Sequence, residues 1–285
     1  MFVSIGAVNL IVAMIIFFYL PSRPSEAKFL NEEERAFIDL RLRLDHAGVG
    51  MKVLRWRSIY EVFGDLQTWL LCLITILTCL SSGFITTYSA TVIKQFGYNP
   101  RQAALLNMPS GIVSIAFTVL STYVIACGYQ RWVSTIACLV PALIGACLMS
   151  FLPKTNKAGL LVGIYLVNAT VAPYALYLSW TGANYRGYTR KVAGSAVIGA
   201  AFGIANIIGP QTFQAKDAPN YYPAKYTLVV TTSSAIVCAL MLRVLYGYRN
   251  AQADKANRAA MSCVEQRVVG SSPADVAEKE WRYVY

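Results

Sequence analysis

The sequence predicts an all-α, polytopic membrane protein with about seven transmembrane helices. Of its 285 residues, 56% are hydrophobic and only 14% are charged, and the mean hydropathy is +0.48. The apolar residues gather into runs of roughly 20 residues, the length that an α-helix needs to cross a bilayer. None of the 14 Asp and Glu residues falls inside a run. A soluble domain of this size is therefore excluded.

The first predicted helix covers residues Val3 to Leu20, which carry no charge, and ends at Pro21. A cleaved signal peptide is the competing interpretation. No basic region precedes this run, however, and no small-x-small cleavage pattern follows it. We therefore expect a retained helix.

A polar segment follows from Pro21 to Asp65, and one surface helix is predicted within it. Asn31 caps a run of three glutamates, and Arg41 and Arg43 lie in the last turn, a charge order that suits the helix dipole. Three apolar side chains share one face of this helix: Phe37, Leu40 and Leu44. The helix is expected either to lie on the membrane or the cytoplasmic ends of the bundle, or to be a solvated linker.

Six further spans complete the prediction. They are Leu66 to Ile93, Gln102 to Ala126, Trp132 to Leu152, Gly159 to Trp180, Val192 to Phe213, and Tyr226 to Tyr246. Arg243 in the last span is near enough to its end to extend toward the membrane surface. Kinks are expected at four internal prolines, which are Pro109, Pro141, Pro173 and Pro210.

The span beginning at Val192 has two notable features. Ser195, Gly199 and Gly203 recur every four residues and predict a small-residue face that another helix approaches closely. On this prediction, Gly203→Leu separates the two helices. Asn206 and Gln211 near the end of the span place amide groups where they must face protein or a water-filled cavity.

The basic residues predict the orientation. Nineteen of the 25 Lys and Arg residues fall on one side of the predicted helices and six on the other, and the richer side is cytoplasmic. The N-terminus is then outside, and the polar tail from residue 247 to 285 is cytoplasmic and expected to be disordered.

Several function classes are excluded. The net charge of +11 comes from loops beside apolar runs, which argues against nucleic-acid binding. Six cysteines lie in apolar runs and Cys263 lies in the tail, without CxxC or Cys/His pairs, so we expect free thiols, no metal and no cofactor. His46, the only histidine, lies in a loop. No paired carboxylates or nucleophile motif indicate an enzyme.

Five pieces of sequence resemble one transporter family. They are the stretches 20–24 and 28–35 (LPSRP and KFLNEEER), the loop from Trp180 to Lys191 (W-x-x-x-N-x-x-G-x-T-R-K), Asn206 to Pro210 (NIIGP), and Ala218-Pro219-x-Tyr221. Together they resemble the fungal allantoate permease branch of the major facilitator superfamily, the anion:cation symporters.

The resemblance implies only part of that fold, whose twelve helices form two six-helix halves. Residues 1–20 correspond to the family's sixth helix, 21–65 to the central loop, 66–246 to the C-terminal six-helix bundle and 247–285 to the tail. The first five helices have no counterpart, so we expect a truncated gene product or a fragment. Because alternating access rocks one half against the other, such a chain is expected to be inactive without a partner half.

The resemblance also indicates where substrate binds. The cavity would be lined by the spans beginning near Leu66, Gln102, Gly159 and Val192. Amides and phenols there can donate hydrogen bonds to a carboxylate without burying a cation. The candidates are Tyr88, Asn107, Asn168, Tyr174, Asn206 and Gln211. Interhelical hydrogen bonding, at about 0.6 kcal/mol per contact, is the structural alternative for each of them. The loop from Gly128 to Arg131 matches the position of the superfamily's basic gating motif but lacks its acidic member.

The predicted function is therefore secondary active transport of small organic anions, such as allantoate-like ureides or vitamin-like carboxylates, across the plasma membrane. The expected partners are the anion, the bilayer, and the missing N-terminal half or a full-length relative. Two alternatives remain, a seven-helix receptor and a non-transporting membrane fragment or regulatory subunit.

Overall fold

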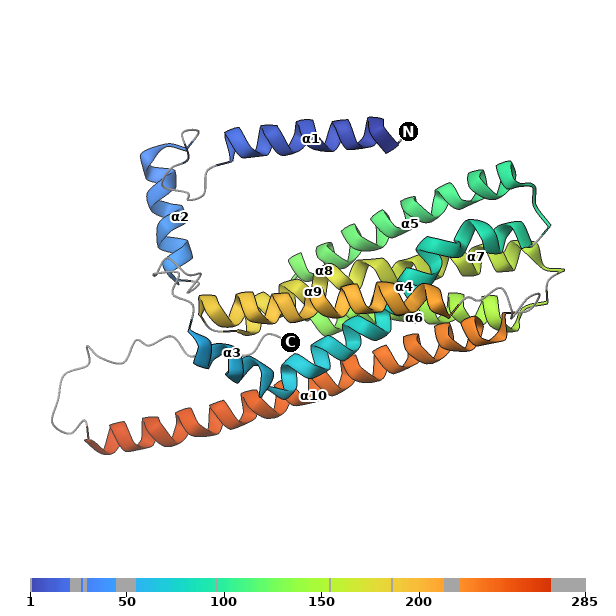
Figure 1. The fold of residues 1–285 in the computed structure, drawn as a ribbon. Coiled ribbons are helices and arrows are strands. Elements are labelled where there is room, and N and C mark those ends of the chain that lie inside the picture. Colours follow the sequence, from blue (N-terminus) through green and yellow to red (C-terminus); the bar gives the residue numbers. More distant parts are fainter. Residues whose placement is uncertain are drawn as a thin grey trace. The chain divides into compact units, whose positions relative to one another are not determined.

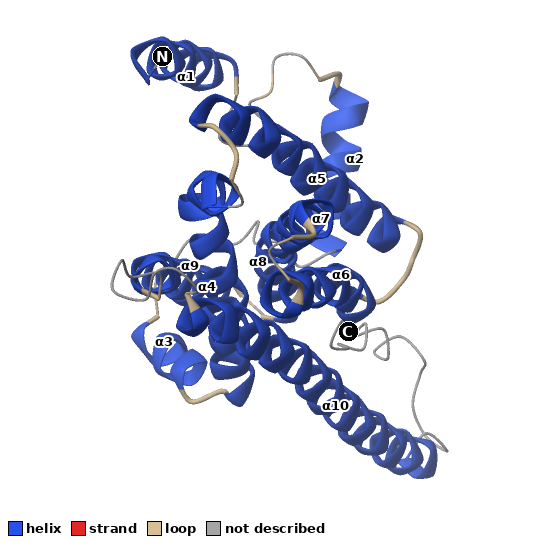
Figure 2. Ribbon diagram, turned by 90° about the vertical axis from the view of Figure 1, so that its right-hand side faces the viewer, coloured by secondary structure: helices blue, strands red, loops and turns tan. Residues whose placement is uncertain are grey.

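The computed structural model describes residues 2–20, 27, 30–44, 55–95, 97–153, 155–185, 187–212 and 221–267. No strand occurs among these residues, and nearly all of them are helical (Figure 2). The chain forms two compact units. Unit 1 comprises Met1–Arg55 and Arg186–Thr189, and unit 2 comprises Trp56–Tyr185 and Arg190–Tyr285. The all-α prediction is confirmed.

Unit 1 contains α1 (Phe2–Tyr19) and α2 (Glu32–Leu44). The backbone N–H of Asn31 donates to Glu34 Oε2 at 3.0 Å, which fixes the start of α2 as its capping sequence predicts. Arg35 Nη2 donates to the carbonyl of Ala27 at 2.6 Å. Phe37 and Leu40 are exposed, whereas the side chain of Leu44, the third member of the predicted face, is outside the described set.

Among the described residues, the six helical segments that are long and apolar enough to cross a membrane belong to unit 2. Its elements are α3 (Trp56–Phe63), α4 (Leu66–Gln95), α5 (Pro100–Ala126), α6 (Arg131–Phe151), α7 (Lys157–Val167), η2 (Asn168–Val171), α8 (Ala172–Asn184), α9 (Tyr188–Gln211, whose first two residues are assigned to unit 1) and α10 (Tyr222–Arg267). The seventh predicted span, α1, is a shorter apolar helix. In unit 2, α10 packs against both α4 and α6 (Figure 1).

Local sequence fixes where several of these helices begin. Asp65 Oδ1 accepts from the N–H of Gln67 at the start of α4 (3.1 Å), and Asn156 Oδ1 accepts from Gly159 N at the start of α7 (3.1 Å). At the start of α5, Asn99 N donates to Gln102 Oε1 at 3.1 Å, and Pro100 follows at the first helical position. These contacts satisfy amide groups that a helix start leaves without an intrahelical acceptor.

One predicted span is interrupted halfway. Residues 157–184 form α7, the 3₁₀ turn η2 and α8 in succession. Pro173 follows the turn, and a proline cannot donate the hydrogen bond that would continue an α-helix through it. Asn168 Nδ2 donates to the carbonyl of Ile164 at 2.8 Å and stabilises the break. The helices containing Pro109, Pro141 and Pro210 continue through those residues.

The core of unit 2 consists of two apolar clusters. One surrounds Trp180, Tyr177 and Tyr246, which are fully buried, and the Trp180 and Tyr246 rings lie 5.7 Å apart. The other surrounds Phe84 and Ile164. In a membrane, contacts of this kind stabilise helix association by packing rather than by release of water.

The packing face of α9 differs from the predicted one. An added Cβ at Gly199 or Gly203 would meet nothing within 4 Å among the described residues. From Arg190 onward, the buried residues of α9 instead lie on another face: Gly194, Ile198, Ala201, Ala205 and Gly209. Small residues occupy both faces of this helix, so their spacing alone could not identify the packed one. The prediction for Gly203→Leu was therefore wrong.

The corrected prediction compares two glycines of α9. A Cβ at Gly209 would lie 2.9 Å from the carbonyl oxygen of Leu80, a backbone atom that cannot yield. We expect Gly209→Leu to reduce the folded yield several-fold and Gly203→Leu to leave it unchanged. Size-exclusion chromatography of both fluorescently tagged variants in detergent measures this, and equal yields would contradict the assigned face.

The C-terminal segment is more ordered than expected. Helix α10 continues to Arg267, so residues 247–267 of the predicted disordered tail are helical, whereas residues 268–285 lie outside the described ones. Residues 248–267 are polar, but they are rich in alanine and contain neither proline nor glycine. Helix propensity therefore favours order there.

Candidate functional site

The helices α4 and α9 meet closely at two glycines. Gly209 lies against the backbone of Leu80, as described above, and Gly83 lies against Asn206. A Cβ at Gly83 would be 3.3 Å from Asn206 Oδ1 and 3.6 Å from Asn206 Cα. The absence of a side chain at Gly83 leaves room for this amide against the backbone of α4, where a Cβ would be in tight contact with Asn206 Oδ1.

Asn206 belongs to a small cluster of side chains from three helices. Its Nδ2 donates to the carbonyl of Phe202, one turn earlier on α9, at 2.9 Å. The ring of Phe202 stacks on Tyr174 of α8, with centroids 4.4 Å apart and planes inclined by 30°. We call Gly83, Tyr174, Phe202 and Asn206 the amide–aromatic cluster. Two predicted site residues, Tyr174 and Asn206, are thus brought together through Phe202.

A second polar group joins α5 to the broken span. Ser110 Oγ donates to the carbonyl of Asn107 at 2.6 Å, and Ser114 Oγ donates to the carbonyl of Asn168 at 3.4 Å. Nearby, Tyr165 OH donates to the carbonyl of Leu106 at 2.6 Å. The predicted residue Asn168 therefore belongs to the α5–η2 contact, whereas the contact of Asn107 with Ser110 lies within α5.

The remaining two predicted residues lie elsewhere. Tyr88 packs against the apolar cluster of Phe84, with ring centroids 6.2 Å apart. Gln211 is the exposed last residue of α9. The structure thus distributes the six predicted residues over separate places rather than one shared surface.

The amide–aromatic cluster offers neutral hydrogen bonding beside an aromatic surface. Asn206 uses one of its two Nδ2 hydrogens for Phe202, and the second can donate to an anion. Residues 66–216 contain no Asp or Glu, so no carboxylate on α4 to α9 would repel such an anion. Phe202 and Gly83 were not among the residues predicted from the sequence, although Phe202 precedes Asn206 by one helical turn.

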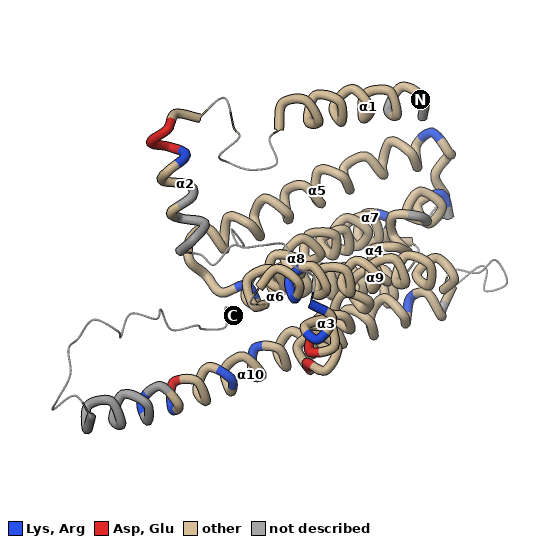
Figure 3. Tube along the Cα trace, turned by 60° about the vertical axis from the view of Figure 1, so that its left-hand side comes forward, with Lys and Arg blue, Asp and Glu red and all other residues tan. Residues whose placement is uncertain are grey.

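A separate polar network lies where α4 begins. Arg249 of α10 donates to both carboxylate oxygens of Asp65, at 2.5 and 3.3 Å, and to Gln67 Oε1 at 3.4 Å. Tyr185 hydrogen-bonds with Thr68. Burial raises the pKa of Tyr185 to about 12, so it stays protonated at neutral pH. Glu61 of α3 pairs with Arg190 of α9. We call the end of unit 2 that holds this network the basic end, and Figure 3 shows Lys and Arg near its helix ends.

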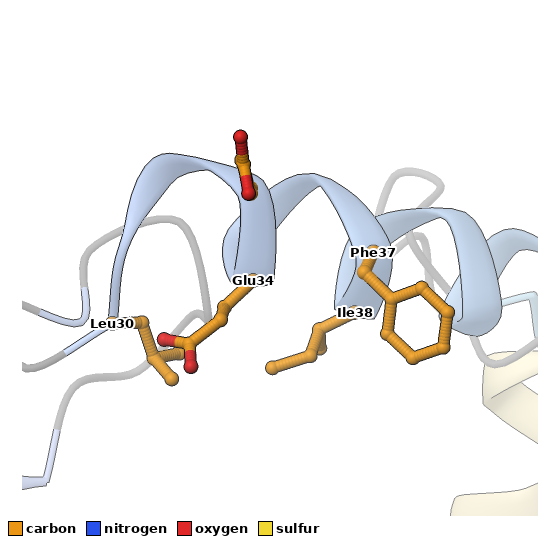
Figure 4. Close-up of a pocket in the computed structure, with 5 residues that line it drawn as sticks. Leu30, Glu34, Phe37 and Ile38 are labelled. Atoms are coloured by element: carbon orange, nitrogen blue, oxygen red, sulfur yellow. The ribbon is translucent and has the colours of Figure 1, made fainter.

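Among the side chains that the structure describes, no group of three His, Cys, Asp or Glu residues could hold a metal ion. The six cysteines whose side chains the structure describes are free thiols. The side chain of Cys263 lies outside the described residues. A shallow groove in unit 1 is lined by Leu30, Glu33, Glu34, Phe37 and Ile38 (Figure 4). All five come from α2 or the residue before its cap, so the groove is a feature of one helix surface.

Comparison with known proteins agrees with this architecture. Residues 1–210 match the Major Facilitator Superfamily. The chain is 32% identical to the MFS-type transporter cnsL of Penicillium expansum over 84% of this chain and 52% of that protein. It is 30% identical to the allantoate permease of Saccharomyces cerevisiae (90% and 48%) and 28% identical to the thiamine pathway transporter of the same yeast (100% and 54%). No solved structure matches.

The chain spans about half the length of the curated relatives it matches. The family match nevertheless covers most of the chain, and the six apolar helices of unit 2 have the length and composition that a polytopic transporter fold requires. This chain is a membrane protein of the major facilitator superfamily.

Proposed function

We propose that this chain forms the second half of a secondary active transporter for small organic anions. The observation that carries the proposal is the amide–aromatic cluster, in which α4, α8 and α9 place an amide donor beside two stacked rings. The break at η2 supports it, because transporter sites are typically built at interrupted helices near the middle of the membrane.

The chemistry of the cluster favours an anion that also carries a flat polar group. An amide N–H binds a carboxylate without a buried counter-charge, and the Tyr174 and Phe202 rings can stack on a planar ureide or heterocycle. One relative named for allantoate supports a substrate of that class. On this proposal the remaining candidates, Tyr88, Asn107, Asn168 and Gln211, do not contact the anion while it is bound at the amide–aromatic cluster.

Asn206→Ala tests the site. A hydrogen bond to a charged group contributes about 1.5–3 kcal/mol, so we expect the variant to bind allantoate at least tenfold more weakly. Asn206→Asp keeps the shape but adds a negative charge, and is expected to abolish binding. Isothermal titration of the purified chain, coexpressed with the N-terminal half of a relative, measures both affinities.

Thr86→Val is the matched control, since Thr86 is an exposed residue of α4 whose hydroxyl bonds only its own helix among the described residues. It should bind like the unchanged chain. Equal affinity of Asn206→Ala and Thr86→Val would remove Asn206 from the site and contradict the proposal.

The partner and orientation are part of the same proposal. We place the basic end and the tail in the cytoplasm, with the N-terminus outside and the protein in the plasma membrane.

The open face of Ser195, Gly199 and Gly203 on α9 is smooth enough for a helix of the missing half to pack against it. Copurification with a full-length relative, without anion binding, would favour the non-transporting subunit instead. Membership of the superfamily disfavours a seven-helix receptor.

A further inference from the structure

An arginine lies on the outward apolar surface of α10. Arg243 is partly exposed, and its neighbours Leu240, Met241 and Val244 are exposed, Val244 to 70%. In a bilayer, such a surface faces acyl chains, where a guanidinium is costly unless it reaches the headgroup region. The position of Arg243 therefore requires an explanation beyond the packing of α10.

The guanidinium of Arg243 is directed along α10 toward the basic end. A Cβ built on Gly247, one turn farther along the helix, would lie 3.0 Å from Arg243 Nη1. The missing side chain of Gly247 leaves room for the guanidinium there. Arg249, two residues beyond Gly247, pairs with Asp65 at the start of α4. The Arg243 side chain thus extends from the apolar part of α10 toward the polar end of unit 2.

Trp132 of α6 contacts the Arg243 guanidinium where it extends toward the basic end. Arg243 Cζ lies 5.9 Å from the centroid of the Trp132 ring, within cation–π range. The Trp132 indole N–H donates to Gln130 Oε1 at 2.6 Å, which fixes the ring. Tryptophan at the start of a membrane helix is typical of the interface between acyl chains and headgroups.

A second arginine borders this place. Arg131 Nη1 donates to the carbonyl of Ser179 at 3.4 Å, whereas its Nε is buried without a hydrogen-bond partner among the described residues. A buried donor without an acceptor costs about 1–3 kcal/mol. The carboxylates Glu61 and Asp65 at the same end are paired with Arg190 and Arg249. The Nε atom itself is covered by protein, but Arg131 as a whole is only half-buried, so its guanidinium can supply positive charge to a ligand at this edge.

We propose that Arg131, Trp132 and Arg243 form a binding site for the phosphate of an anionic phospholipid at the α6–α10 edge. Arg243 donates to the phosphate from the α10 side, Arg131 supplies the second positive charge, and the acyl chains lie along the exposed apolar side chains of α10. Charge complementarity favours anionic over zwitterionic lipid, and the apolar surface beside the arginines favours a lipid over a free ion.

The test uses the purified full chain in detergent micelles, titrated with dioleoylphosphatidylserine or dioleoylphosphatidylcholine and followed by native mass spectrometry. We expect selective retention of phosphatidylserine. Arg243→Gln should weaken that retention about fivefold, the contribution of one basic residue at an anionic surface, and Arg243→Lys should recover most of it. Arg258→Gln, an exposed arginine farther along α10, is the matched control and should have no effect.

Two results would overturn the proposal: equal phosphatidylserine binding by Arg243→Gln and Arg258→Gln, or displacement of the lipid by inorganic phosphate alone. If Arg243→Gln does not fold, the proposal is tested on the unchanged chain, by measuring how strongly brominated lipids quench its tryptophan fluorescence. Stronger quenching by brominated phosphatidylserine than by brominated phosphatidylcholine supports the site, and equal quenching contradicts it. No transport is measured, so this result is independent of the proposed substrate site.

Discussion

Replacement of Gly145 by alanine is expected to be among the most destabilising single changes in unit 2. Gly145 of α6 faces α7 so closely that a Cβ would lie 2.6 Å from the carbonyl oxygen of Gly163 and 2.9 Å from the amide nitrogen of Val167. Both atoms belong to backbone within a helix, so relief requires the two helices to separate. We expect a loss of about 3 kcal/mol in unfolding free energy, the upper range for overpacking a well-packed core.

Thermal unfolding of the purified chain in micelles measures this effect, and Gly199→Ala is its control. Gly199 undergoes the same chemical change inside a helix, but an added Cβ meets nothing within 4 Å among the described residues. Alanine favours helix over glycine by up to about 1 kcal/mol, so Gly199→Ala should melt at the same temperature or slightly higher. A Gly145→Ala variant as stable as Gly199→Ala would show that α6 and α7 are not in close contact.

The second large effect is expected from Asp65→Ala. The carboxylate of Asp65 caps α4 through Gln67 N and accepts two hydrogen bonds from Arg249. Both side chains of the pair are only 23% exposed. The change removes the cap, which contributes about 1 kcal/mol, and leaves Arg249 without its carboxylate. We expect the unfolding free energy to fall by about 2–3 kcal/mol, since partial exposure moderates the cost.

Glu61→Ala is the comparison for Asp65→Ala. Glu61 is also a paired carboxylate at the basic end, but it and its partner Arg190 are each 42% exposed. Solvent screens such a pair, which contributes less than about 1 kcal/mol. Melting temperatures of the two variants should therefore differ clearly, and the Glu61 effect should vanish in high salt. Equal losses would show that the Asp65–Arg249 pair does not hold α10 against the start of α4.

Local sequence was sufficient for the boundaries of most elements. The helix starts at Asn31 and Asn99 follow from side chains that bond the first turn, and the spans end within a few residues of the predicted positions, except the last, which continues from Tyr246 to Arg267. Such features depend on neighbours within four residues. The interruption at residues 168–171 was only half predicted, because Pro173 forbids a regular helix without determining whether the chain bends or forms a 3₁₀ turn.

The sequence allowed a polar amide to be chosen for the candidate site, but it did not identify which other residues surround that amide. Asn206 could be chosen from sequence because an amide in an apolar helix needs a polar neighbour. Its contact with Gly83, 123 positions away, and the stacking of Phe202 on Tyr174 depend on how α4, α8 and α9 cross. No periodicity within a single helix contains that information.

By itself, the sequence determined that this protein is helical, lies in a membrane and belongs among the major facilitators, because apolar length, charge placement and short motifs are properties of local segments. Only the tertiary structure decided which face of α9 is packed, which glycines are indispensable and which polar side chains meet. These outcomes depend on contacts between distant segments. In α9, where small residues line two faces, only the neighbouring helix could select between them.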